Sequence, residues 1–115
     1  MQLITTNDKE KVLVLKTNPY FSDLSPEILA EVLSGMRLYC FEKNETIFWE
    51  GDESSGLHMI RKGSVKLFKI SPKRRELVIK VMDDGATFNE VPEFDHQPNP
   101  VNVSAVEESE VWVIE

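Results

Sequence analysis

The chain has 115 residues, and its 20 acidic and 13 basic side chains give a formal net charge of −7. This length is sufficient for one domain with a single hydrophobic core. A negatively charged surface repels phosphate backbones and anionic membranes, so nucleic-acid binding by this chain alone is not expected. The chain lacks a basic start followed by an apolar run and any apolar stretch long enough to span a bilayer, so we expect no membrane contact. Its one cysteine, Cys40, cannot form an internal disulfide and fits a reducing cytoplasm.

The first third of the chain is predicted to be a helical lead-in, over residues 1–36. Residues 8–16, DKEKVLVLK, open with charge and then turn apolar, which is typical of a short helix. Ser25 and Pro26 form a helix start, because serine caps the first turn and proline loses no hydrogen bond there. Apolar residues follow at helical spacing on one face, and Gly35 is expected to end the helix: Ile28, Leu29, Val32, Leu33 and Met36.

Residues 37–115 are predicted to form β structure. Short alternating runs are separated by turn-forming segments such as EKNE, EGDESSG and RKG, and SPKRRE at residues 71–76 is expected to be a hairpin tip. Short strands at this spacing favour an antiparallel barrel or sandwich over a parallel sheet. The predicted fold class is therefore mainly β (α+β), with N-terminal helices packed on the β structure. The chain ends on VWVIE, inside a predicted strand, so we expect it to be part of a longer protein.

The stretch NETIFWEGDESSGLHMIRKGSVKLF resembles the cyclic-nucleotide-binding β-roll of the Crp/Fnr transcription regulators. The matching positions are Ile47, Glu50, Gly51, Leu57, Ile60, Gly63 and Val65. The resemblance implies one sensor domain over residues 1–115, with a double-stranded β-helix or jelly-roll-like β-roll and a short cassette helix at residues 90–94. In the family, a dimerisation helix and a helix-turn-helix domain follow, and neither lies within this chain. DNA contact would therefore need that second domain, and the full-length protein is expected to be a homodimer.

The cassette that holds the ligand in this family matches residues 88–105 only in part. In cyclic-nucleotide binders it opens with Phe-Gly-Glu and closes with Arg-Ser or Arg-Thr; the Arg neutralises the phosphate and the Glu binds the ribose. Alignment places Phe88, Asn89 and Glu90 at the opening, and Asn99 and Pro100 at the Arg-Ser positions. Asn99 cannot neutralise a charge, and Pro100 has neither a hydroxyl nor an N–H.

The charge of the same segment disfavours a phosphate ligand. Residues 85–105 contain no Lys or Arg, whereas Glu90, Glu93 and Asp95 are acidic. Burying a phosphate without a cation costs at least several kcal/mol. The basic run at residues 73–75 is the nearest by sequence that could reach in. Cyclic AMP is therefore not the expected ligand, and the small-molecule effector stays unidentified.

A second resemblance keeps haem open as a cofactor. The pattern FNE…FD…PNP…A is similar to the Fnr and nitrogen-oxide-responsive branches, in which some members sense NO or CO through haem and others sense oxygen through an iron–sulfur cluster. The cluster needs several cysteines, and only Cys40 is present. His58 and His96 are candidate axial haem ligands, together with Cys40 or a methionine. The alternative makes His58 a strand residue and His96 a surface turn residue, and the two are too isolated to suggest any other metal site.

No catalytic constellation is present, so the chain is predicted to be a binding module and not an enzyme. Two functions stay open: an effector-sensing domain of a transcription regulator, and a protein-interaction module that binds no small ligand. Pro92, Pro98 and Pro100 favour the second, because prolines preset a conformation. Trp49 and Trp112 are expected to be core or strand-face residues, and Cys40 is expected to pack at a strand start.

Overall fold

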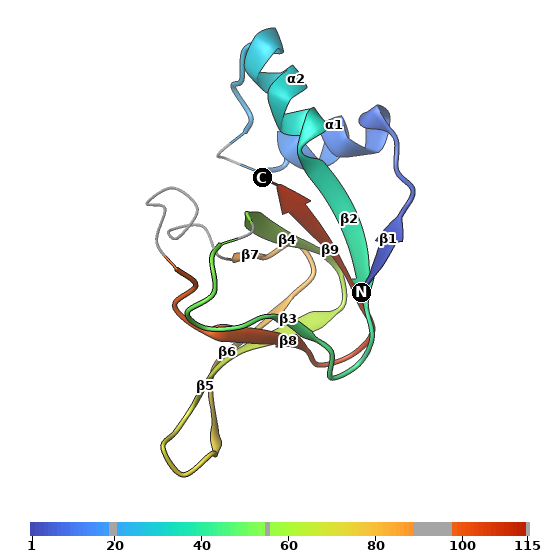
Figure 1. The fold of residues 1–115 in the computed structure, drawn as a ribbon. Helices are drawn as coiled ribbons and strands as arrows, with labels where there is room; N and C mark the ends of the chain where they lie inside the picture. Colours follow the sequence, from blue (N-terminus) through green and yellow to red (C-terminus); the bar gives the residue numbers. More distant parts are fainter. Residues whose placement is uncertain (19–20, 55, 89–97, 115) are drawn as a thin grey trace.

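A computed structural model describes residues 1–18, 21–54, 56–88 and 98–114. Two helices and nine strands are assigned in these ranges (Figure 1). In chain order they are β1 (Gln2–Ile4), α1 (Asp8–Lys16), α2 (Pro26–Ser34), β2 (Met36–Phe41), β3 (Thr46–Phe48), β4 (Leu57–Lys62), β5 (Ser64–Ile70), β6 (Glu76–Asp83), β7 (Thr87–Phe88), β8 (Asn102–Ala105) and β9 (Ser109–Ile114).

The strands form two antiparallel sheets. One sheet has the order β1-β2-β9-β4-β7, and the other has the order β3-β8-β5-β6. The chain passes between the sheets several times; two of these crossings lie between β4 and β5 and between β8 and β9. The predicted mainly β (α+β) class is confirmed. The predicted cassette helix at residues 90–94 lies outside the described residues.

The two predicted helices are confirmed, but the boundary of the lead-in is wrong in two places. The Ser25 side chain accepts a hydrogen bond from the backbone N–H of Ile28, and Gly35 caps the end of α2. Met36 is not part of the helix; it begins β2 and is completely buried. The sequence also gave no sign of β1, which pairs with β2 through Gln2 and Cys40 at one end. Cys40 therefore lies within β2, not at a strand start.

Side chains from the five-stranded sheet contribute to two hydrophobic cores. Between the sheets lie Phe41, Phe48, Ile60, Val65, Phe88, Val103, Ala105 and Val111. Between the five-stranded sheet and the helices lie Leu15, Met36, Leu38, Leu57, Met59, Trp112 and Ile114. Successive side chains of strand β9 point to opposite faces of the sheet and so enter both cores. Both faces of this strand are therefore buried, which explains why VWVI is apolar throughout and shows no alternation of polar and apolar residues.

The predicted turns are confirmed at three places. Gly51 and Gly63 have φ values of 87° and 115°, which L side chains rarely adopt. The tip of the β5–β6 hairpin lies at residues 71–75, where Arg74 has φ 62°. This hairpin projects from the rest of the domain (Figure 1). Strand β6 is at the edge of its sheet, and its aliphatic side chains are largely exposed.

Gly63→Ala should destabilise the domain far more than Gly85→Ala. A Cβ at position 63 would lie 2.3 Å from Ser109 Oγ and 2.8 Å from its Cα, whereas a Cβ at Gly85 would meet nothing within 4 Å. Both glycines have positive φ, which costs an alanine about 1–2 kcal/mol, and the overlap at position 63 adds about 1–3 kcal/mol. Urea denaturation measures both free energies of unfolding. Equal losses for the two variants would contradict the crowding at the corner.

Candidate functional site

The predicted cassette residues are only partly within the described structure. Phe88 ends β7 and is buried, and the chain is described again from Pro98 onward. Asn99 is 3% exposed and Pro100 is exposed. Asn89 and Glu90, which the alignment placed beside the ligand, and the candidate haem ligand His96 lie outside the described residues.

Phe88 belongs to a cluster of three rings between the sheets. It is the register partner of His58 across β4 and β7, and the two rings stack with centroids 5.0 Å apart. Phe48 at the end of β3 packs on the same imidazole edge-on, at 5.2 Å. Three strands therefore bring an aromatic cluster to the inner end of the cassette, which sequence reasoning did not predict because the rings are far apart along the chain.

His58 is a neutral core histidine in this structure. It is 2% exposed, and its Nδ1 lies 2.9 Å from the carbonyl oxygen of Gly56. A carbonyl only accepts, so Nδ1 carries the hydrogen and Nε2 keeps its lone pair. Burial lowers the pKa of His58 to about 4, although the Gly56 hydrogen bond opposes this shift.

The packing of His58 does not fit an axial haem ligand. A neutral imidazole with a free lone pair can bind iron, but the ring is almost fully buried and packs against Phe48 and Phe88. A haem could reach it only after core residues had moved. Among the described residues, no group of three or more His, Cys, Asp or Glu is placed to hold a metal ion.

Asn99, which the alignment placed at the family's phosphate-binding Arg, is hydrogen-bonded to the loop after β3. Its side-chain Nδ2 donates to the carbonyl of Trp49 at 3.2 Å. Its backbone carbonyl accepts from the N–H of Gly51, and its backbone N–H donates to the carbonyl of Asp52. Flipping the amide would put two acceptors together, so the orientation is fixed by Trp49. Its Oδ1 is buried and has no hydrogen-bond partner within the described structure. Asn99 thus donates a side-chain hydrogen bond to the protein's own loop.

Asn102 holds the same loop from β8 and was not predicted as a site residue. Its Oδ1 accepts from the backbone N–H of Glu50 at 2.8 Å, and its Nδ2 donates to the carbonyl of Phe68 at 3.3 Å. Two buried asparagines therefore fix residues 49–52. An Asn that begins a strand of otherwise small and apolar residues is a weak sign of a buried hydrogen bond, and the sequence does not identify its partner.

The two basic groups considered for the cassette are the hairpin tip and Lys69, and each is placed elsewhere in the described structure. The run at residues 73–75 lies at the exposed tip of the β5–β6 hairpin, which projects away from β7 (Figure 1). Lys69 does approach the loop that Asn99 holds, but its Nζ lies 3.6 Å from the carboxylate of Glu50. Its charge is thus already partly neutralised.

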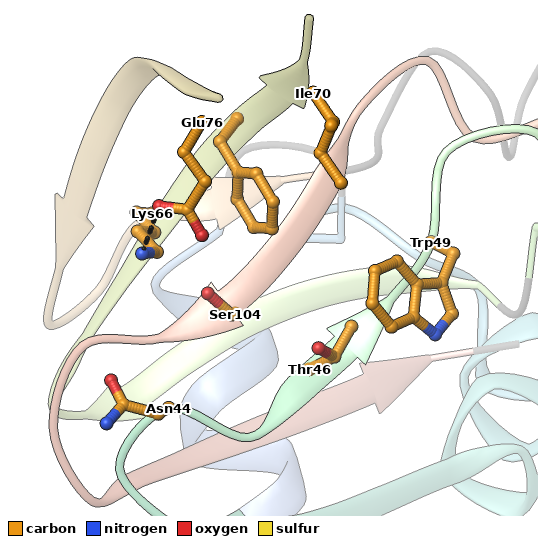
Figure 2. A pocket seen from close by; sticks show the side chains of 8 residues that line it. Asn44, Thr46, Trp49, Lys66, Ile70, Glu76 and Ser104 are labelled. Atoms are coloured by element: carbon orange, nitrogen blue, oxygen red, sulfur yellow. Dashed lines mark hydrogen bonds and ion pairs between the residues drawn. The ribbon is translucent and has the colours of Figure 1, made fainter. Parts of the chain in front are cut away.

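A separate pocket lies on the outer face of the four-stranded sheet (Figure 2). It has a volume of about 280 Å³ and is lined by Asn44, Thr46, Trp49, Lys66, Phe68, Ile70, Glu76 and Ser104. Trp112 is buried in the core as predicted, whereas Trp49 is 50% exposed at the pocket wall. None of the predicted site residues lines this pocket.

Comparison with known proteins now identifies the family. Residues 39–115 match the cyclic nucleotide-binding domain. The chain belongs to the cyclic nucleotide-binding domain family. The resemblance to Crp/Fnr regulators and the jelly-roll-like fold are thereby confirmed.

Three of the similar proteins are a cyclic AMP receptor protein and two transcriptional regulators. The chain is 27% identical over 100 residues to the cyclic AMP receptor protein of Thermus thermophilus, covering 87% of this chain and 46% of the relative. It is 31% identical to the N-terminal domain of a transcriptional regulator from Streptomyces coelicolor, with a TM-score of 0.71 and coverage of 86% and 69% of the two chains. The sensor domain of the transcriptional regulator DNR from Pseudomonas aeruginosa shares the fold, with 24% identity, a TM-score of 0.82 and coverage of 92% and 71%. The chain spans about half the length of the curated relative it matches. In the parts of the chain that the structure describes, no helix is long and apolar enough to cross a membrane.

Acid should destabilise the domain through His58. The folded-state pKa of about 4 lies below the usual 6.5, so the unfolded chain binds the proton more tightly, and stability falls as the pH drops below 6.5 toward 4. The expected loss from this residue between pH 7.5 and pH 5.5 is about 1.4 kcal/mol. Urea denaturation of the wild type and His58→Phe at both pH values isolates it, because the carboxylates are common to both proteins. Equal pH dependence in the two proteins would contradict the shift.

Proposed function

We propose that the chain is the effector-sensing domain of a Crp/Fnr-type transcription regulator whose effector is not a cyclic nucleotide. The family assignment and the regulators among its relatives support the sensing role. The proposal that the effector is not a cyclic nucleotide rests on the side chain of Asn99. By alignment it stands at the position of the family's phosphate-binding Arg, and its neutral amide donates to the carbonyl of Trp49. A phosphate anion is held most strongly by a positively charged donor, and the neutral Asn99 side chain brings no charge.

Sensing would then act as a shift between two packings of the domain. A ligand shifts such an equilibrium only as far as it binds one packing better than the other. Two residues connect the cassette region to the rest of the domain. Phe88 stacks on buried His58, and Asn99 is hydrogen-bonded to the loop after β3. In the full-length cytoplasmic protein, a dimerisation helix and a helix-turn-helix domain would convert this shift into DNA binding by a homodimer. The domain itself would bind and not catalyse.

A second candidate function, protein interaction without a small ligand, is favoured by the β5–β6 hairpin. Residues 64–83 contain six basic and two acidic side chains, which puts a formal charge of +4 on the hairpin and −11 on the rest of the chain. Four aliphatic side chains of β6 are more than half exposed: Leu77, Val78, Ile79 and Val81. A basic, apolar projection of this kind suits an acidic protein surface, such as the body of a second copy.

A thermal-shift series should separate the effector classes. Cyclic AMP and cyclic GMP at millimolar concentration should leave the Tm unchanged, because Asn99 brings no positive charge to the phosphate. A true effector at 100 times its Kd should add about 2.7 kcal/mol of stability. The remaining panel is haem and small aromatic acids. A clear shift with cyclic AMP would contradict the proposed effector class, and silence across the whole panel would contradict sensing of these ligands.

Any ligand that gives a shift can be assigned to its site with two variants. Asn99→Asp removes the donor to Trp49 at the cassette, whereas Thr46→Val alters the separate outer pocket. A cassette effector should lose its shift in the first variant and keep it in the second. The opposite pattern would move the effector away from the cassette.

Hairpin docking predicts weak, salt-sensitive self-association. Sedimentation velocity at low ionic strength should show concentration-dependent association that falls as salt rises, since the attraction joins opposite charges. Leu77→Ser combined with Ile79→Ser should weaken it, because both exposed side chains would be buried in the contact. Leu13→Ser, which changes an equally exposed residue on α1, is the matched control. A strictly monomeric protein at all salt concentrations would exclude the second copy as the partner.

A further inference from the structure

The outer pocket differs from the cassette in position and in chemistry. Its floor comes from the outward-facing residues Lys66, Phe68 and Ser104 of β5 and β8, whose neighbours Val65 and Val103 face the inner core. A ligand here would lie on the other side of the four-stranded sheet from the aromatic cluster of Phe48, His58 and Phe88. The pocket is therefore spatially separate from the proposed effector site.

Two aromatic side chains give the pocket an apolar surface. Phe68 is buried in the floor, and Trp49 forms a wall with half of its surface exposed. Burying a large aromatic surface is favourable, so a half-exposed indole beside a recess is a ready stacking surface for an apolar ring face. Ile70, also half exposed, extends this apolar side.

Hydrogen-bonding groups surround the aromatic surface. Thr46 and Ser104 are register partners across β3 and β8, so two hydroxyls lie side by side. Asn44, held at φ 70°, adds an amide, and Glu76 adds a carboxylate. Figure 2 shows Trp49 on one side of the pocket, the Lys66–Glu76 pair on the other, and Thr46 and Ser104 between them. Hydroxyl and amide groups both donate and accept, so the rim matches a ligand that does the same.

Charge excludes ionic ligands. Lys66 Nζ lies 2.7 Å from the Glu76 carboxylate, so the one cation and the one anion of the lining neutralise each other. Binding an anion would have to break this pair inside a chain of net charge −7. A cation would meet Lys66, whose Nζ already lies 5.3 Å from the centre of the Phe68 ring. The ligand is therefore uncharged.

We propose that this pocket binds a neutral pyranose sugar. A pyranose has C–H groups on its faces, which can stack on Trp49, and hydroxyls around its whole perimeter, which can reach polar groups on several sides. A flat heterocycle carries fewer polar atoms and would leave part of the rim unpaired. The volume of about 280 Å³ falls just below the usual ~300–1,000 Å³ of ligand pockets, which suits one ring and not a larger molecule.

The two tryptophans provide the assay. Acrylamide should quench Trp49, which is half exposed, and not Trp112, which is 1% exposed. Glucose, galactose and N-acetylglucosamine, titrated to 100 mM, should protect Trp49 from acrylamide in a saturable way. Saturation-transfer NMR on the same samples detects contact with sugar C–H groups. Trp49→Ala should abolish the NMR signal while circular dichroism shows an intact fold, because the side chain is not in a core.

Polar variants test the rim. Thr46→Val and Ser104→Ala should each weaken sugar binding about 2- to 12-fold, the equivalent of one neutral hydrogen bond. Thr5→Val makes the same change at an exposed position before α1 and should leave binding unchanged. Three outcomes would overturn the proposal: no protection by any sugar up to 100 mM, binding that survives Trp49→Ala, or protection by neutral aromatics such as indole but not by sugars. Each leaves the cassette proposal untouched, because that site is tested by Asn99→Asp.

Discussion

The fold depends on the contact between Gly63 and Ser109, where two of the chain crossings between the sheets meet. Gly63 lies between β4 and β5, which belong to different sheets, and Ser109 starts β9 just after the chain returns from β8. Ser109 Oγ accepts from the N–H of Ser64 at 3.1 Å and lies 2.8 Å from the carbonyl of Glu107. The two crossings are so close that position 63 has no room for a Cβ. The buried hydroxyl of Ser109 thus forms hydrogen bonds with backbone groups that do not pair with a neighbouring strand at this corner.

This corner determines where the candidate site lies. It aligns β4 beside β9, so that His58 pairs with Val113 on one side and with Phe88 on the other. The imidazole is therefore buried between the sheets, which makes the neutral form the favourable one. On the second sheet, the same crossing places β8 beside β5, and Asn102 joins them by donating to Phe68. The loop at residues 49–52 is then held by both Asn99 and Asn102.

Local signals in the sequence predicted the elements well, because each depends on a few adjacent residues. The Ser25–Pro26 helix start and the positive-φ glycines at 51 and 63 are of this kind. The errors are long-range. Strand β1 exists because it pairs with β2, and Met36 is a strand residue because β9 lies beside it. Alternation in β6 predicted a strand correctly, but it could not show that this strand is an edge whose aliphatic residues stay exposed.

At the candidate site too, the sequence predicted what depends on residue type but not what depends on contacts between distant residues. Reading Asn99 as unable to neutralise a phosphate needed only the residue type, whereas its bond to Trp49 needed the loop geometry. That bond has a physical consequence for both faces of the sheet. Trp49 forms the wall of the outer pocket, and its own carbonyl accepts from Asn99. Any movement that takes Asn99 out of place must break this hydrogen bond or move the backbone of Trp49 with it. Because the Oδ1 of Asn99 is buried without a partner in the described structure, at a cost of about 1–3 kcal/mol, the residue is held there by its other bonds and not by complete satisfaction. The hydrogen bond from Asn99 to Trp49 therefore connects the cassette to the outer face through a residue that keeps one buried acceptor unpaired in the described structure.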